Sequence, residues 1–415
     1  MSKLGTSVLC IVAAFGTYFC MYGLRKPFTS ASYDAQLFWG LDYKTVLVTA
    51  QVLGYTLSKF LGISVIGGMV PERRVKTLLA LVGVALLALL LFAITPAPWN
   101  VLWLFVNGLP LGMVFGLVLS FLEGRRATEA LAAGLCASFI LADGVAKSLG
   151  AWLLGVGIPE PWMPFVAGAL ASVPLLLFAL LLTRIPSPSA DDIQQRKERI
   201  PMTAGQRGQL FRAWAGGLLL LMGTYLLLTV LRSVRADFAP ELWKELGYGG
   251  QPSVFARSEF LVMAGVVVAS GLTVLVRDNK RAFFLSLGSC VLGFVLVGVA
   301  LLGRGAWLSG FSFMVLVGLG LYLPYVAIHT TIFERLLALA QQRGNVGYLL
   351  YLADSFGYLG YVGVMLGKSA LARTGHFLEF FTGLAGGSVG LSTVMLLGCV
   401  LYFSRRTAAP ENTEE

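Results

Sequence analysis

Apolar stretches of about 20 residues recur along the whole chain, and each is long enough to cross a hydrocarbon core of roughly 30 Å. Hydrophobic residues make up 57% of the sequence and charged residues 13%, which identifies a polytopic membrane protein. We therefore predict an all-α membrane protein with twelve transmembrane helices. The predicted spans are Leu4 to Phe28, Thr45 to Ile66, Thr77 to Ile94, Val101 to Leu122, Leu131 to Leu154, Pro164 to Thr183, Ala213 to Arg235, Phe255 to Val276, Ala282 to Leu302, Trp307 to Phe333, Val346 to Leu366 and Thr382 to Phe403.

One long polar stretch interrupts this pattern and separates six spans from six. It divides the chain into a six-helix bundle at residues 1–184, a cytoplasmic linker at 185–211 and a second six-helix bundle at 212–415.

The two halves repeat each other. The pattern Gly-Thr-Tyr followed by Leu-Arg occurs at residues 16–25 and again at 223–232, an offset of 207 residues. Leu-Ala-Asp in the fifth span ends at Asp143, and the same tripeptide in the eleventh span ends at Asp354. Parallel repeats of this kind place a binding site near the bilayer midplane, where the halves meet. We therefore predict two pseudo-symmetric bundles with a site between them.

Basic residues indicate how the chain is oriented. Nineteen of them fall in predicted loops on one side of the membrane and five in loops on the other, which predicts that both termini and the linker are cytoplasmic. The expected location is the cell (inner) membrane. The net charge of +10 reflects this topology, so we expect no nucleic-acid partner. The first span lacks a small-residue cleavage site, and we expect it to remain in the mature protein.

Arg25 and Arg232 are the repeated arginines, and each lies at the far end of an apolar run. An ionisable group within a membrane helix is costly and predicts a functional site. Helical spacing of i, i+4 and i+7 puts Tyr18 and Tyr22 on the face of Arg25, and it puts Tyr225 on the face of Arg232. A guanidinium offers a planar fork that binds phosphate or carboxylate in bidentate fashion. The alternative is that these side chains extend to the membrane interface.

Several motifs carry a closer resemblance. Residues 21–28 read Met-Tyr-Gly-Leu-Arg-Lys-Pro-Phe, and residues 54–60 read Gly-Tyr-Thr-Leu-Ser-Lys-Phe. Leu-Arg at 231–232, Asp-Phe-Ala-Pro at 237–240, Tyr-Leu-Pro at 322–324 and Phe-Gly-Tyr-Leu-Gly at 356–360 follow in order. The chain resembles the organophosphate:phosphate antiporters of the major facilitator superfamily, which include glycerol-3-phosphate and hexose-phosphate transporters.

This resemblance implies that Arg25 and Arg232 clamp a phosphate, one from each half. Lys26 and Lys59 would add positive potential around it, and Tyr55 lies one helical turn from Lys59. The predicted substrate-binding residues are Arg25, Lys26, Lys59, Arg232, Tyr18, Tyr22, Tyr55, Tyr225 and Tyr358.

Asp143 and Lys147 are four residues apart in the middle of the fifth span. They form either an intrahelical ion pair that neutralises both groups, or a gate or proton-linked carboxylate. The antiporters commonly have a histidine near the position of Asp143, so this chain departs from them there. Asp354 is the pseudo-symmetric partner, and these three residues are the predicted coupling or gating residues. His329 and His376 lie toward helix ends, where we expect no central role.

No nucleotide-binding loop, nucleophile triad or metal cluster is recognisable, and the five cysteines are scattered singly, so we predict neither an enzyme nor a metal or cofactor site. The predicted function is secondary transport of a phosphorylated metabolite or related organic anion by alternating access, in exchange for phosphate. We expect a monomer whose partners are a small, phosphate-bearing anionic solute and the lipid bilayer. Two alternatives remain open: a proton-coupled transporter of a carboxylate or neutral solute, and a non-transporting membrane sensor of the same fold.

The charge bias makes a topology prediction. Single cysteines introduced at Ala190 and Pro410 should react with an impermeant thiol reagent from the same, cytoplasmic face, and Arg304→Cys should react from the other face. Labelling of residues 190 and 410 from opposite faces would contradict the predicted arrangement.

Overall fold

The computed structural model describes residues 3–33, 37–38, 40–67, 69–122, 128–186, 204–339, 346–371 and 376–408. Twelve helices in these ranges have 18 residues or more: α1 (Lys3–Met21), α2 (Tyr43–Gly67), α3 (Pro71–Ile94), α4 (Val101–Leu119), α5 (Thr128–Gly155), α6 (Met163–Leu182), α9 (Ala215–Asp237), α11 (Ser253–Val274), α12 (Asn279–Gly303), α13 (Gly310–Ala327), α15 (Val346–Leu371) and α16 (Phe377–Ala408).

Shorter elements join the long helices. β1 (Leu37–Phe38) and β2 (Leu41–Asp42) form a small antiparallel hairpin. The short helical segments are η1 (Tyr22–Leu24), η2 (Pro27–Ser30), α8 (Ala204–Ala213), α10 (Ala239–Trp243), η3 (Lys244–Tyr248), η4 (Ile328–Ile332) and α14 (Phe333–Leu339). Two of these segments, η3 and η4, are π turns.

The twelve long helices correspond in order to the twelve predicted spans. Eleven helical segments of the described chain are long and apolar enough to cross a membrane. The twelfth helix, α2, has 25 residues but carries Lys44, Gln51 and Lys59, all of them buried. Its polar side chains therefore face the protein interior, where they are available to bind groups on neighbouring helices.

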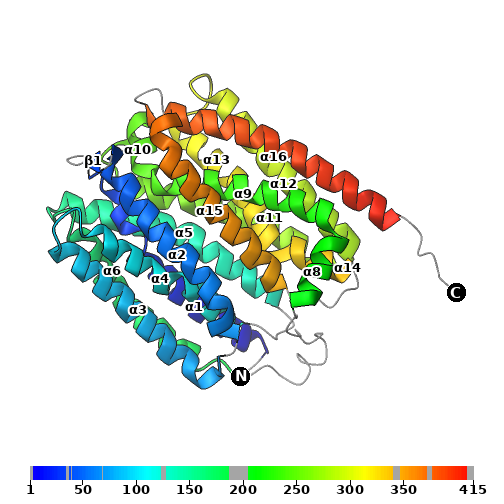
Figure 1. The fold of residues 1–415 in the computed structure, drawn as a ribbon, viewed down its shortest axis with the longest axis horizontal. Coiled ribbons are helices and arrows are strands. Elements are labelled where there is room, and N and C mark those ends of the chain that lie inside the picture. Colours follow the sequence, from blue (N-terminus) through cyan, green and yellow to red (C-terminus); the bar gives the residue numbers. More distant parts are fainter. Residues whose placement is uncertain are drawn as a thin grey trace.

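The helices pack as two groups (Figure 1). In the first, α1 contacts α5 and α6, and α4 contacts α2 and α3; in the second, α9 contacts α15 and α16, and α13 contacts α11 and α12. The groups meet where α2 lies against α15 and α5 lies against α11. Most of the predicted linker, residues 187–203, lies outside the described residues, so the boundaries at 185–211 remain a prediction.

The two ends of the bundle differ. We call the end where α1 begins and α16 ends the terminal end, and the end that carries β1 and α10 the opposite end (Figure 1). The turn η2 contacts α10 there. At the opposite end Lys44 Nζ of α2 lies 2.5 Å from Glu241 Oε1 of α10. Ser148 of α5 donates a hydrogen bond to the carbonyl of Pro252 at 2.6 Å. These contacts join the two groups of helices at the opposite end.

Two glycines allow α2 and α4 to lie in close contact. A Cβ atom on Gly54 would lie 2.1 Å from the carbonyl oxygen of Phe105, and one on Gly108 would lie 2.2 Å from the carbonyl oxygen of Gln51. In lipid, such small residues let helix backbones approach each other. The contact positions α2, whose polar face lines the centre of the bundle.

Gly108→Ala should therefore lower stability, because the added methyl group meets backbone that cannot move aside. We expect a loss of about 1–3 kcal/mol, seen as a lower melting temperature in detergent. Gly83→Ala is the matched control, since a Cβ atom at Gly83 meets nothing within 4 Å and alanine favours a helix. Equal melting temperatures for the two variants would contradict this account of the α2–α4 contact.

Candidate functional site

Helix α1 ends before its predicted boundary. The α-helix stops at Met21, and the backbone amides of Arg25 and Lys26 both donate to the carbonyl of Tyr22, at 3.0 and 2.9 Å. Pro27, which has no N–H, begins the next turn. The prediction of one helix to Phe28 is therefore wrong, and Arg25 and Lys26 instead lie on a tight turn.

Arg25 is buried, with 5% of its surface exposed. Its guanidinium carbon lies 3.9 Å from the ring centroid of Tyr55 and 5.7 Å from that of Tyr22. Gln51 fixes the turn, because its side-chain amide donates to the carbonyl of Arg25 at 3.1 Å and to Asn107 Oδ1 at 2.8 Å. The turn thus holds the guanidinium against tyrosine rings.

Arg232 occupies the corresponding place in the second half, on the last turns of α9. Its guanidinium carbon lies 4.4 Å from the ring centroid of Tyr325, and Nη2 donates to the Tyr358 hydroxyl at 3.4 Å. Tyr225, which the spacing placed with Arg232, instead donates its hydroxyl hydrogen to Asp354. The two arginines therefore have similar aromatic surroundings, built from different tyrosines.

Both arginines line one narrow cavity between the halves. Its other lining residues are Tyr22, Lys26, Val52, Asp143, Ser233, Asp237, Tyr322, Tyr358 and Tyr361. An adjoining narrow cavity shares Tyr22, Arg232 and Tyr358 and is also lined by Tyr18, Tyr55, Lys59, Phe115, Phe139, Tyr325, His329 and Asp354. The structure thus brings together the residues singled out from the sequence. Lys147 and Tyr225 join them through Asp143 and Asp354.

The buried lysines around these cavities are paired with carboxylates. Lys26 donates to Asp237 across the interface between the halves. Lys59 Nζ lies 3.0 Å from Asp354 Oδ2, again across that interface. In this structure Lys26 and Lys59 are therefore neutralised, whereas the resemblance implied that they add positive potential.

Lys147 and Asp143 form the expected pair within α5. Asp143 has a second neighbour, because its Oδ1 atom lies 3.9 Å from Lys26 Nζ. This oxygen is buried and has no hydrogen-bond partner. Asp143 therefore belongs to a cluster that also includes Lys26 and Asp237.

Two residues of the site were missed by the sequence reasoning. Asp237 binds Lys26 and accepts a hydrogen bond from Tyr361 at 2.9 Å; its place five residues after Arg232 was the available signal. His329, expected to be peripheral, lies in the π turn η4 with 6% of its side chain exposed, and its Nε2 atom is 3.7 Å from Asp354 Oδ1. In the described part of the chain, no group of three His, Cys, Asp or Glu side chains could hold a metal ion.

Arg25 and Arg232 differ from the buried lysines. Within the described residues, neither has a carboxylate oxygen within 4.0 Å. The Nε atoms of both are buried and have no hydrogen-bond partner. Burying an unpaired charge is costly, so a fold that keeps two such guanidiniums on one cavity is suited to an anion from outside the chain.

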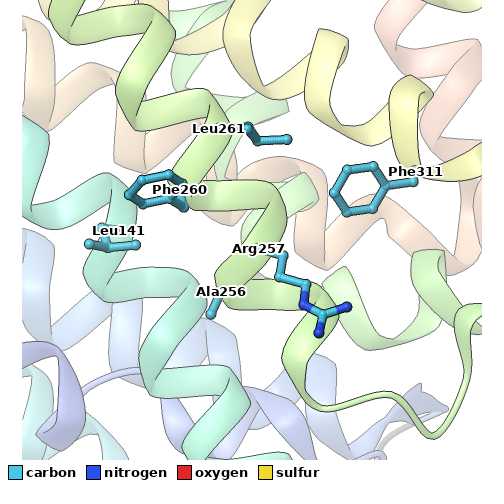
Figure 2. A pocket seen from close by; sticks show the side chains of 6 residues that line it. All are labelled: Leu141, Ala256, Arg257, Phe260, Leu261 and Phe311. Carbon is cyan, nitrogen blue, oxygen red and sulfur yellow. The ribbon is translucent and has the colours of Figure 1, made fainter.

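A larger and more open groove lies between α5 and α11 (Figure 2). Its lining residues are Leu141, Ala256, Arg257, Phe260, Leu261 and Phe311, and Phe260 is 53% exposed. Figure 2 shows Arg257 as the one charged side chain among the apolar ones. An open, apolar groove of this kind is not suited to a polar solute.

Comparisons with known proteins agree with this architecture. A family described as "Family of unknown function (DUF5690)" matches residues 27–406. No curated protein matches the chain. The solved structure of a D-xylose-proton symporter is similar, with a TM-score of 0.62 and 14% sequence identity over 95% of this chain and 97% of that one. The predicted major facilitator fold is thus confirmed, but the narrower resemblance to organophosphate antiporters does not follow from these matches.

The Asp143–Lys147 pair leads to a prediction about stability. Asp143→Asn alone leaves Lys147 buried without its closest anion, and losing one partner of a buried pair costs about 3–5 kcal/mol. Replacing both, with Asp143→Leu and Lys147→Met, should recover most of the melting temperature, since Lys26 keeps Asp237. A double variant as unstable as the single one would show that Asp143 is needed by other groups.

Proposed function

This chain belongs to DUF5690, a family of unknown function, and we propose that it is a secondary transporter of a small organic anion. The anion binds between Arg25 and Arg232, and a phosphorylated metabolite or a related anion is the solute class. The protein works by alternating access, with both termini in the cytoplasm, as a monomer in the cell (inner) membrane.

The charge balance around the cavities carries this proposal. The described chain has seven buried cations: Arg25, Lys26, Lys44, Lys59, Lys147, Arg232 and Arg235. Lys44 pairs with the partly exposed Glu241, and the other six stand against four buried carboxylates, Asp143, Asp237, Glu259 and Asp354. Contacts within 4.0 Å assign each carboxylate to a lysine or, for Glu259, to Arg235 at 2.8 Å. Two positive charges remain, and they are on the two guanidiniums that face one cavity.

Two guanidiniums suit a doubly charged anion. Each can donate two parallel hydrogen bonds to a phosphate or carboxylate, and arginine is well suited to this planar geometry. The surrounding hydroxyls of Tyr22, Tyr322 and Tyr358 can donate further hydrogen bonds. A phosphate group, or a short dicarboxylate, meets both requirements.

Alternating access requires that the two groups of helices separate at one end of the bundle at a time. At the opposite end they are joined by polar contacts: Lys26 with Asp237, Lys44 with Glu241 and Ser148 with Pro252. Each contact can exchange its partner for water when that end opens. These contacts are therefore well suited to serve as a reversible gate.

A second candidate is a proton-coupled transporter of a carboxylate or neutral solute. The similar solved structure is a D-xylose-proton symporter, and Asp143 has a buried oxygen without a hydrogen-bond partner. A non-transporting sensor of the same fold is the third. Counterflow of labelled phosphate in proteoliposomes separates transport from sensing, because a sensor exchanges no solute.

Arg25→Lys and Arg232→Lys should each weaken binding of inorganic phosphate about tenfold to a hundredfold. The charge is kept but the bidentate geometry is lost, and a hydrogen bond to a charged group contributes about 1.5–3 kcal/mol. The measurement is calorimetric titration of the purified protein. Arg257→Lys is the matched control, because Arg257 is exposed in the apolar groove between α5 and α11, away from the cavity of Arg25 and Arg232. Unchanged phosphate affinity in both cavity variants would refute the proposed site.

A further inference from the structure

Asp354 is placed between groups from both halves of the bundle. Its Oδ2 atom lies 3.0 Å from Lys59 Nζ of α2. Its Oδ1 atom accepts a hydrogen bond from Tyr225 of α9 and lies 3.7 Å from His329 Nε2 of η4. One carboxylate thus faces a fixed cation from the other half and a titratable base from its own half.

The hydrogen bonds of His329 determine which of its nitrogens can accept a proton. Nδ1 lies 3.0 Å from the backbone carbonyl of Tyr325, and because a carbonyl only accepts, Nδ1 carries the hydrogen. In the neutral ring Nε2 is then an unprotonated acceptor. It faces Asp354 and the Tyr225 hydroxyl, which is 3.5 Å away. A proton that arrives at Nε2 is placed beside a carboxylate, where a charge-assisted hydrogen bond forms.

We propose that His329 Nε2 is a proton-binding site and that H⁺ is a co-substrate of the transported anion. A hydronium ion gives a proton to the Nε2 lone pair, so one O–H bond breaks, one N–H bond forms and a neutral water molecule remains. Asp354 then pairs with the imidazolium, and Lys59 loses its exclusive partner. The inference rests on the proposed function only in taking the solute to be an anion.

Two consequences follow from this exchange of partners. The Lys59–Asp354 contact joins α2 to α15, so its weakening loosens the interface between the halves. Lys59 also lines the cavity that contains Arg232, so its released charge makes that cavity more positive. Proton and anion therefore bind cooperatively, and by linkage each strengthens the binding of the other.

Charged groups of both signs lie around His329. Lys59 and Arg232 repel the imidazolium and Asp354 attracts it; an anion bound at Arg232 removes part of the repulsion. Tyr325 lies between the two sites, with its ring centroid 4.3 Å from that of His329 and 4.4 Å from the Arg232 guanidinium carbon. Helices α12 and α14 also contact η4, but they contribute no side chain to the lining of this cavity. Its titratable and charged lining residues are Tyr18, Tyr22, Tyr55, Lys59, Arg232, Tyr325, His329, Asp354 and Tyr358.

The first test uses the two histidines of the chain, His329 and His376. Nitrogen NMR of the purified full-length protein with ¹⁵N-labelled histidine reports the tautomer and charge of each ring, and His376→Gln assigns the signals. We expect His329 to carry its hydrogen on Nδ1 when neutral and to gain a proton on Nε2 as the pH is lowered over the range in which the protein stays folded. A ring that stays neutral over that range overturns the proposal without any substitution at His329.

The second test measures coupling with inorganic phosphate as the probe. Titration calorimetry in buffers of different ionisation enthalpy gives the number of protons taken up per phosphate bound. Because phosphate itself titrates near neutral pH, the informative quantity is the difference between variants in the number of protons taken up per phosphate. The measurement is made at a pH where His329 is largely neutral in the phosphate-free protein. Wild type and His376→Gln should then take up more protons than His329→Gln, by up to about one per phosphate.

The outcomes distinguish this proposal from the proposed function. Phosphate binding with equal proton uptake in wild type and His329→Gln overturns the proton site and leaves the anion site standing. If phosphate binds to neither wild type nor His329→Gln, the proposal is tested by the distance between spin labels on α2 and α15, measured as the pH is lowered. A separation that grows as His329 gains its proton supports the proton site and refutes the solute assignment, whereas a constant separation overturns the proton site as well.

Discussion

The pairing of lysines from one half of the bundle with carboxylates from the other holds the two halves of this structure together. Lys26 pairs with Asp237, Lys44 with Glu241 and Lys59 with Asp354, and in each pair the lysine belongs to the first half. The interface is thus electrostatically complementary as well as packed. In a medium without water each pair is strong while it is closed, and it can open only where water or another ion replaces the lost partner.

The internal repeat helps to separate the roles of these charges. Arg25 and Arg232 are related by the repeat, and so are Asp143 and Asp354. The repeat is not kept four residues after these aspartates: Lys147 follows Asp143, whereas Tyr358 follows Asp354. Asp143 is consequently neutralised within its own helix, whereas Asp354 binds Lys59 across the interface. One substitution in a duplicated motif thus gives two equivalent carboxylates different partners.

Much of the fold could be predicted from the sequence, because hydrocarbon thickness fixes the length of a span and the repeat fixes the relation between halves. The shared cavity of Arg25 and Arg232 follows from the same repeat. The lysine–carboxylate pairs could not be predicted, since Lys26 and Asp237 are 211 residues apart and no local spacing connects them. His329 was misjudged because its position depends on a π turn that begins four residues after Pro324. The end of α1 at Met21 was missed because the apolar run continues past it.

The turn after α1 links the Arg25 guanidinium to the Lys26–Asp237 ion pair. Arg25 and Lys26 are consecutive, and their amides are tied to the same carbonyl, that of Tyr22. One side chain faces the cavity against Tyr55, and the other reaches across to Asp237. Because both side chains project from this one turn, a rotation that draws the Arg25 guanidinium toward a ligand also displaces the Lys26 ammonium. Binding of a ligand is thereby coupled to the ion pair that joins the two halves.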